Sequence, residues 1–291
     1  MIRSFLFVPA DSEKKLAKAA ALDADALILD LEDAVAAEAR PRAREIAKAF
    51  LEERHRPAVW VRINPLDTED ALLDLAAVLR AAPAGIVLPK PRGPGDVAAL
   101  ADRLAELEQD ANLPVGDTPI LPIVTERPDA VLAVPGYGRE TPRLAALTWG
   151  AEDLSAALGA VTARDEEGRW LPVYELARSL CLLAAAAAEV PAIDTVYTDY
   201  RDLDGLARYA ARARRDGFTG MLAIHPAQVP VINEAFAPSA DEIERARRVV
   251  AAFAAHPGAG TVGLDGKMLD RPHCIRARRV LELAERLECA K

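Results

Sequence analysis

Short apolar runs alternate with longer amphipathic stretches over the first 230 or so residues of this chain. The runs are rich in Val, Ile, Leu and Phe, and the stretches between them have helical spacing, so strands and helices alternate. Strands that are apolar on both faces and joined by long crossovers pair in parallel. The predicted strands span residues 4–9, 26–33, 58–65, 85–90, 120–126, 144–150, 192–198 and 220–226.

Eight such units in about 230 residues predict a (β/α)8 TIM barrel. A doubly wound open sheet is the alternative, but no Gly-x-Gly-x-x-Gly follows any predicted strand. The pattern changes afterwards to an amphipathic helix at 241–255, a Gly/Pro segment at 256–260 and a last helix ending near Cys289. We therefore expect a barrel domain of residues 1–235 and a C-terminal helical extension of residues 236–291.

Composition narrows the class of protein. The 291 residues are 51% hydrophobic, enough for a large core, and the net charge of −9 disfavours a nucleic-acid-binding surface. The apolar run at 5–8 is too short for a signal peptide, and the uncharged run at 179–188 is too short to span a membrane. Three cysteines without CxxC spacing indicate reduced thiols, so we expect a cytoplasmic protein without membrane contact.

The ends of the predicted strands are unusually polar. In a (β/α)8 barrel the active site forms at the carboxyl ends of the strands, where these residues would share one rim. Any one of them alone is more often an ordinary loop residue or helix cap. The polar strand ends carry Asp30, Glu32 and Asp33; Arg62 and Asn64; Lys90; Glu126; Gly150, Ala151, Glu152 and Asp153; and His225.

Two of these carboxylates suggest a metal site. Glu126 and Asp153 end the fifth and sixth predicted strands, and together they could hold one hard cation while leaving positions for a substrate. Carboxylates without a Cys/His cluster suit Mg²⁺ or Mn²⁺, and Arg62 would bind an acidic small molecule. Alternatively, Glu152 and Asp153 only begin a helix, where acidic residues favour the positive end of the dipole.

Lys90 and His225 each have two interpretations. A lysine at a strand end can form a Schiff base with a carbonyl substrate, but beside metal-binding carboxylates it more often supplies charge or a structural ion pair. His225 is either a base or, more simply, a buried histidine bonded to backbone. No Gly-x-Ser-x-Gly and no P-loop is present, so the signatures of a serine hydrolase and of an NTPase are missing.

Taken together and in order, eight segments resemble the citrate lyase beta-subunit-like family, also called the HpcH/HpaI aldolase/citrate lyase family, which includes malyl-CoA and citramalyl-CoA lyases. Each segment is weak alone, but the resemblance runs along the whole chain. The segments are RSFLFVP at 3–9, LDLEDA at 29–34, VRIN at 61–64, LPK at 88–90, Glu126, GAED at 150–153, IHP at 224–226 and DGKMLD at 265–270.

The resemblance implies an often trimeric (β/α)8 barrel with Mg²⁺ on Glu126 and Asp153, and an arginine, here Arg62, that stabilises charge developing on a substrate oxygen. It also implies that Asp270 reaches a neighbouring subunit's site and acts as acid or base. Without the resemblance, Asp270 would be taken for a helix N-cap. Arg127-Pro128 departs from the small residues expected there, which leaves the shape of that loop open.

From this we expect a Mg²⁺-dependent carbon–carbon lyase that cleaves or forms a malyl-CoA-type or citramalyl-CoA-type thioester through an enolate. A cation and a guanidinium would stabilise that enolate. Arg62 and Gly150 to Asp153 would bind the substrate, with the backbone amides near Ala151 to Asp153 taking a carboxylate oxygen. Secondary site residues would be Glu32, Asp33, Lys90 and His225.

Several alternatives stay open. The chain could be a citrate lyase beta subunit acting on a citryl-acyl-carrier-protein thioester, or a dicarboxylate-binding homologue without catalysis. A synthase or a thioesterase is also open, as are the acyl group and the direction of the reaction. The expected partners are a CoA thioester, a small oxo or hydroxy acid and two further copies of the chain in a homotrimer.

Overall fold

The computed structural model describes residues 2–138 and 141–289. The contacts within the chain divide it into two compact units, which are residues 2–232 and the residues from Asn233 onward. The first unit contains all eight strands of the large sheet, and the second contains a small hairpin between two helices.

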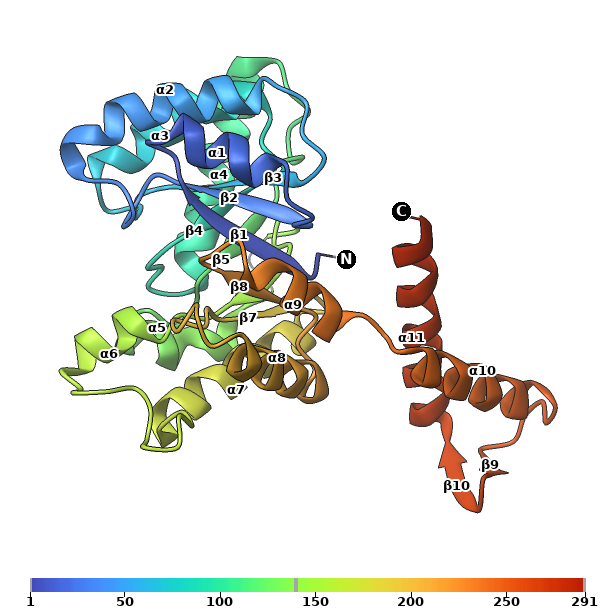
Figure 1. Cartoon of the computed structure of the whole chain (residues 1–291). Coiled ribbons are helices and arrows are strands. Elements are labelled where there is room, and N and C mark those ends of the chain that lie inside the picture. Colours follow the sequence, from blue (N-terminus) through green and yellow to red (C-terminus); the bar gives the residue numbers. More distant parts are fainter. Residues whose placement is uncertain (1, 139–140, 290–291) are drawn as a thin grey trace. The chain divides into compact units, whose positions relative to one another are not determined.

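The larger unit is built on eight parallel strands (Figure 1). Their order is β5-β4-β3-β2-β1-β8-β7-β6, and parallel bridges from Ile120 to Leu144 and from Ile123 to Thr148 join the two ends of the sheet. This is the predicted barrel. The strands are β1 (Ser4–Pro9), β2 (Ala26–Asp30), β3 (Ala58–Arg62), β4 (Gly85–Leu88), β5 (Ile120–Pro122), β6 (Leu147–Thr148), β7 (Ala192–Asp194) and β8 (Gly220–Ala223).

Helices surround these strands in chain order (Figure 1). Three 3-10 turns accompany them: η1 (Ala37–Ala39), η2 (Leu79–Ala81) and η3 (Val134–Gly136). The α-helices up to the end of the sheet, and the one that follows it, are α1 (Glu13–Ala20), α2 (Arg40–Leu51), α3 (Glu69–Val78), α4 (Pro94–Ala111), α5 (Pro128–Ala133), α6 (Glu152–Leu158), α7 (Pro172–Ala187), α8 (Leu203–Asp216) and α9 (Gln228–Phe236).

Burial on both faces explains why the strands have no polar alternation. In β2, Ala26 and Ile28 belong to the core inside the barrel, while Leu27 and Leu29 are equally buried. Successive side chains of a strand point to opposite faces, so the second pair packs outward under the helices. A continuous apolar run is therefore the sequence signature of this sheet.

Most strands are shorter than predicted at their carboxyl ends. The predicted strand 26–33 ends at Asp30, because the Asp30 carboxylate accepts the backbone amides of Glu32 and Ala34 and turns the chain. The predicted strand 120–126 ends at Pro122, and α5 follows with Pro128 in its first turn. Arg127 and Pro128, which stand where the resemblance predicts small residues, thus form the start of α5. Proline is well tolerated at this position of a helix.

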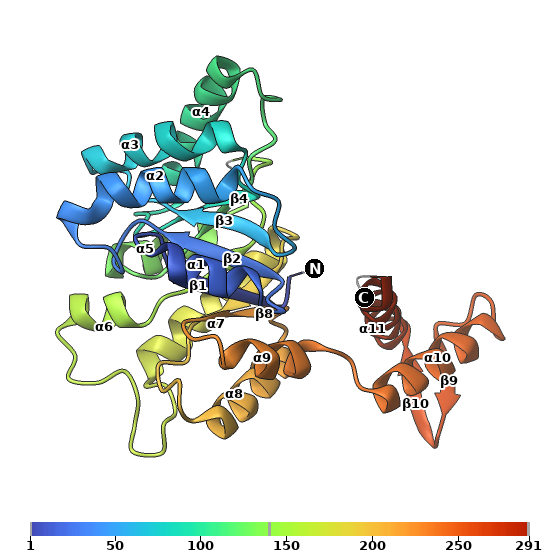
Figure 2. The same ribbon diagram turned by 45° about the horizontal axis from the view of Figure 1, so that its top comes forward.

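The smaller unit contains a hairpin that the sequence analysis did not predict. Its elements are α10 (Ala240–Ala254), β9 (Thr261–Leu264), β10 (Lys267–Asp270) and α11 (Arg271–Cys289), with α10 and α11 in contact (Figure 2). Asp265 and Gly266 connect the antiparallel strands with φ values of 52° and 71°. An Asp-Gly pair between apolar residues is the usual signal of such a turn, so the hairpin was detectable.

Two further observations bear on the expectations from composition. Within residues 2–138 and 141–289, no helix combines the length and the apolar character that crossing a membrane requires. Cys181 and Cys274 are free and buried, and the side chain of Cys289 lies outside the described part. Burial raises the pKa of the Cys181 thiol, which keeps it protonated and unreactive.

A buried ion pair supports the barrel wall beneath β5 and β6. Glu108 of α4 accepts both terminal nitrogens of Arg143, at 2.8 and 2.7 Å, and the backbone amides of Gly116 and Thr118. Burial alone would raise the pKa of Glu108, but these donors outweigh it and lower the pKa to about 2. The charged form is therefore stabilised by folding.

We expect Glu108→Gln to destabilise the protein at pH 7 by up to about 3 kcal/mol, since each pKa unit is worth about 1.36 kcal/mol. A carboxylate whose pKa is lowered on folding contributes stability above its unfolded pKa, near 4.5, and loses it as the pH falls toward 2. Urea unfolding of both proteins should thus show a difference that shrinks over this range. Glu106→Gln, exposed on the same helix, is the control. A pH-independent difference would contradict this assignment.

Candidate functional site

A cavity of about 390 Å³ lies at the carboxyl ends of the barrel strands. Its wall is acidic on one side, whereas Phe7, Ile123 and Leu222 give it an apolar floor continuous with the barrel core. The charged residues that line it are Asp30, Asp33, Arg62, Glu126, Glu152 and Asp153. Gly150 and Ala151 line it as well, so most residues singled out at the predicted strand ends meet at one cavity.

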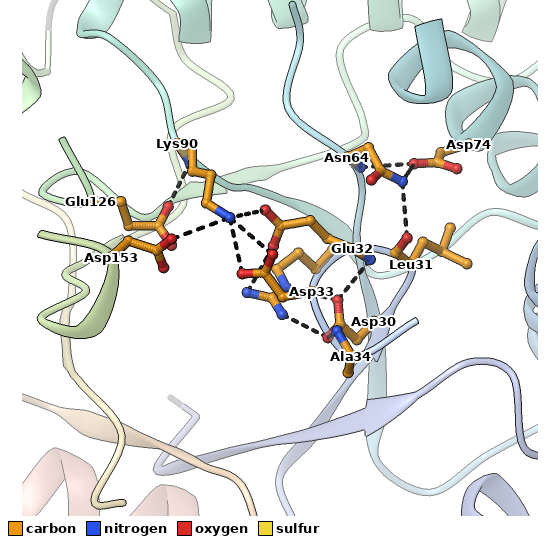
Figure 3. A network of polar contacts seen from close by, with 11 residues as sticks. Asp30, Leu31, Glu32, Asp33, Ala34, Asn64, Asp74, Lys90, Glu126 and Asp153 are labelled. Atoms are coloured by element: carbon orange, nitrogen blue, oxygen red, sulfur yellow. Dashed lines mark hydrogen bonds and ion pairs between the residues drawn. The ribbon is translucent and has the colours of Figure 1, made fainter. Parts of the chain in front are cut away.

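Glu126 and Asp153 come from different strand ends and face each other (Figure 3). Glu126 is buried, and one of its oxygens accepts the backbone amide of Lys90 at 2.5 Å. The Asp153 carboxylate lies 3.3 Å from the amine nitrogen of the same lysine. Burial, together with the negative charges of Glu32 and Asp153, raises the pKa of Glu126 well above its usual value. Lys90 and Arg62 therefore offset only part of the negative charge around Glu126.

A hydroxyl bridge holds the two strand ends together. Thr125 Oγ1 accepts the backbone amide of Gly150 at 3.0 Å and donates to its carbonyl oxygen at the same distance. A Cβ on Gly150 would lie only 2.9 Å from Cγ of Glu126. The glycine is needed for this close approach, and Thr125 aligns the turns that carry Glu126 and Asp153. Sequence reasoning missed Thr125, although a hydroxyl next to Glu126 in an apolar run was visible.

Arg62 is held by carboxylates on neighbouring strands. Asp30 and Arg62 are register partners in β2 and β3, and the Asp30 carboxylate accepts two guanidinium nitrogens at 2.8 and 2.6 Å. The third nitrogen lies 3.0 Å from Glu32, and the guanidinium covers the Phe7 ring at 4.7 Å. These carboxylates outweigh burial and raise the pKa of Arg62. Asp30 thus holds the Arg62 guanidinium in place, a role that the sequence analysis did not assign to it.

Lys90 lies among the carboxylates (Figure 3). Its amine nitrogen is 2.7 Å from Glu32 and 2.9 Å from Asp33, in addition to its contact with Asp153. Burial alone would lower the pKa of Lys90, but these bonds and charges outweigh it and raise the pKa. A Schiff base requires a neutral amine. The ion-pair interpretation of Lys90 is therefore the one that the geometry supports.

The remaining strand-end residues have simpler surroundings. Glu152 and Asp153 stand in the first turn of α6, so the helix-start interpretation also holds, while both line the cavity. Asp33 is exposed and contacts Lys90. His225 is half-buried rather than buried; its Nδ1 accepts the backbone amide of Ala227, and its ring stacks on Tyr200 at 4.8 Å between ring centres.

Asp270 belongs to the smaller unit, where it ends β10 directly before α11. Its side chain is exposed and contacts Nδ1 of His273, which lowers the pKa of the Asp270 carboxyl group. Asp270 directly precedes α11, as the helix-cap interpretation requires, but its close contact is with the His273 side chain rather than with a backbone amide of the helix. A role at the site of a neighbouring copy stays a prediction.

The carboxylates at the cavity suit a metal ion that binds few protein groups and leaves coordination positions for other ligands. Among the described residues, no three His, Cys, Asp or Glu side chains gather as a metal-binding group. Glu126 and Asp153 offer two carboxylates with an excess of negative charge. Mg²⁺ is typically bound through one or two carboxylates and completes its shell with water and substrate. The residues present therefore fit Mg²⁺ better than a structural zinc ion.

Comparison with known proteins gives consistent results. The sequence model of a family described as HpcH/HpaI aldolase/citrate lyase matches residues 3–226. The (3S)-malyl-CoA thioesterase of Cereibacter sphaeroides is 37% identical over 291 residues, covering 97% of this chain and 94% of the relative. The mitochondrial citramalyl-CoA lyase of Mus musculus is 33% identical over 302 residues, covering 97% and 86%.

A solved structure of similar shape carries ligands. The protein CitE from Mycobacterium tuberculosis, in complex with magnesium, acetoacetate and coenzyme A, superposes with a TM-score of 0.82 and is 33% identical. The match covers 97% of this chain and 98% of the other. The similarity therefore extends over both units of the chain.

The close approach of Gly150 to Glu126 predicts that Gly150→Ala displaces that carboxylate. We expect Mg²⁺ binding, measured by calorimetric titration, to weaken by about 10-fold, as for changes in groups that orient metal ligands. Gly95→Ala is the matched control, since a Cβ there meets nothing within 4 Å. Equal Mg²⁺ affinities of the wild type and Gly150→Ala would show that Glu126 does not bind the metal from this position.

Proposed function

This chain belongs to the HpcH/HpaI aldolase/citrate lyase family, and we propose that it is a magnesium-dependent carbon–carbon lyase. Its substrate is a CoA thioester of the malyl-CoA or citramalyl-CoA type, which it cleaves to an oxo acid and an acyl-CoA, or forms from them. The observation that carries this proposal is the cavity on which Glu126, Asp153 and Arg62 meet. The names of the relatives support the thioester.

The chemistry follows from the charge that must move. Cleaving the bond between the hydroxyl-bearing carbon and the carbon next to the thioester places negative charge on the thioester oxygen. Glu126 and Asp153 would hold the metal. When bound, Mg²⁺ would supply positive charge that stabilises negative charge on the substrate oxygens.

Arg62 stabilises the developing oxygen charge. Its guanidinium is immobilised by Asp30 and Glu32, so little reorganisation is needed when the charge appears. The apolar floor of the cavity, with Phe7 and Leu222, keeps water away and strengthens this interaction. Gly150, Ala151 and Glu152 form the wall against which the acid part of the substrate rests.

Proton transfer is assigned to Asp270 of a second copy, whose carboxylate would accept the proton that the substrate hydroxyl loses on cleavage and return it to the enolate carbon. Asp270 is exposed at the end of β10, so its carboxylate is available to a second copy in an oligomer. This assignment comes with the expected homotrimer, in which residues 236–291 of one copy complete the site of the next. The cytoplasmic location likewise stays a prediction.

A thioesterase is the second candidate, favoured by the 37% identity to a malyl-CoA thioesterase. Hydrolysis also develops negative charge on the thioester oxygen, so the same guanidinium and cation serve it. Product analysis separates the two, because cleavage releases an oxo acid and an acyl-CoA, whereas hydrolysis releases a hydroxy acid and free CoA. Activity with a CoA ester by the purified protein alone argues against an acyl-carrier-protein substrate, and binding without turnover would favour a non-catalytic homologue.

The metal assignment is tested by combining Glu126→Gln with Asp153→Asn. Both substitutions keep the shape of the side chains and remove their charge, so we expect lyase activity on malyl-CoA-type substrates and calorimetric Mg²⁺ binding to disappear together. Asp102→Asn, exposed on α4, is the control. Lyase activity that persists in the double variant with EDTA present would show that the reaction needs no metal at these residues.

Arg62→Lys tests the role of the guanidinium. Lysine keeps the charge but loses the fork that Asp30 fixes, so kcat should fall by about 10²–10³, as for removal of a donor to a developing oxyanion. Mg²⁺ binding should change much less, because Arg62 is not a metal ligand. Arg103→Lys, on the exposed side of α4, serves for comparison. A variant with normal kcat and raised KM would instead mark Arg62 as a residue that only binds the ground state.

A further inference from the structure

Lys90 contacts four carboxylates with two different parts of the residue. Its backbone amide donates to Glu126 at 2.5 Å. Its amine nitrogen lies 2.7 Å from Glu32, 2.9 Å from Asp33 and 3.3 Å from Asp153. One residue thus touches both carboxylates assigned to the metal and the carboxylate that contacts Arg62.

The backbone at Lys90 adopts a conformation that non-glycine residues rarely take. Its φ is +50°, in the left-handed region, two residues after the end of β4. Such a conformation persists only where the surroundings enforce it, and residues of this kind cluster at active sites, although helix ends and turns also contain them. At Lys90 it coincides with the amide bond to Glu126 and the ammonium contacts with the other carboxylates.

A continuous chain of ionic contacts runs from Lys90 to the arginine. One oxygen of Glu32 bonds to the ammonium at 2.7 Å, and the other lies 3.0 Å from Arg62. Glu32 is only 2% exposed, and no described donor is aligned for a hydrogen bond to that second oxygen. Two cations therefore hold Glu32, and the orientation of Arg62 on this side depends on the ammonium.

We propose that Lys90 is a positioning residue that orients Arg62 through Glu32 and holds Asp153 with its ammonium group until a divalent cation takes that carboxylate. This inference rests on the proposed function and deepens it. Like charges repel, so the ammonium opposes Mg²⁺ at Asp153 while it supports the arginine. The charge of Lys90 consequently weakens Mg²⁺ binding but supports turnover.

Lys90→Met tests this, because it keeps the backbone amide and the length of the side chain but removes the charge. We expect calorimetric Mg²⁺ binding without substrate to become tighter by about threefold or more, since a repelling charge is lost. We expect kcat at saturating Mg²⁺ to fall by about 100-fold, the usual effect of a misplaced catalytic group. Weaker Mg²⁺ binding, or a kcat within about threefold of the wild type, overturns the proposal.

Two further variants keep the result unambiguous. Lys90→Arg retains a cation for Glu32, so kcat should stay within about 10-fold of the wild type, and a 100-fold loss in this variant overturns the proposal even if Lys90→Met does not fold. Lys48→Met, exposed in the last turn of α2, is the matched control.

Measurements on the wild-type protein distinguish a failure of the proposed function from a failure of the inference about Lys90. If the wild-type protein neither binds Mg²⁺ nor turns over a CoA thioester, the proposed function fails. If it does both and Lys90→Met behaves like the wild type in both measurements, the inference about Lys90 alone fails.

Discussion

Crowding of buried carboxylates is the constraint on which the rest of this site depends. Asp30, Glu32 and Glu126 are almost fully buried, and Asp153 adds a fourth charge beside them. An ionised carboxylate away from water is costly unless it is paired, so the positions of the surrounding cations are not free to vary. Arg62 and Lys90 pair with part of this charge, and the excess that remains beside Glu126 and Asp153 is what a divalent cation would neutralise.

The barrel supplies the geometry that makes this crowding reproducible. Parallel register sets Asp30 beside Arg62, and the hydroxyl of Thr125 ties the turn after β5 to Gly150 after β6. These links are short and lie at the strand ends, where they keep opposed charges in place. The left-handed backbone at Lys90 belongs to the same design, since strain of this kind is retained where other contacts compensate for it.

The same arrangement is compatible with the different activities of the relatives. A thioesterase and a carbon–carbon lyase that act on related CoA esters both develop negative charge on the thioester oxygen. A fixed guanidinium and a carboxylate pair suited to Mg²⁺ serve either reaction. What separates them is the group that delivers or removes a proton and the access of water.

The sequence by itself determined the barrel and where its polar rim lies. Apolar runs buried on both faces and separated by helical stretches allow few other folds, and the residues that end the runs gather at one edge for topological reasons. It even carried the Asp265-Gly266 turn signal that was overlooked. Only the tertiary structure decided that Asp30 grips Arg62, that Thr125 bridges to Gly150 and that Lys90 joins four carboxylates. These contacts join residues that are distant along the chain, and their energies depend on burial and on angstrom-scale distances that no local pattern records.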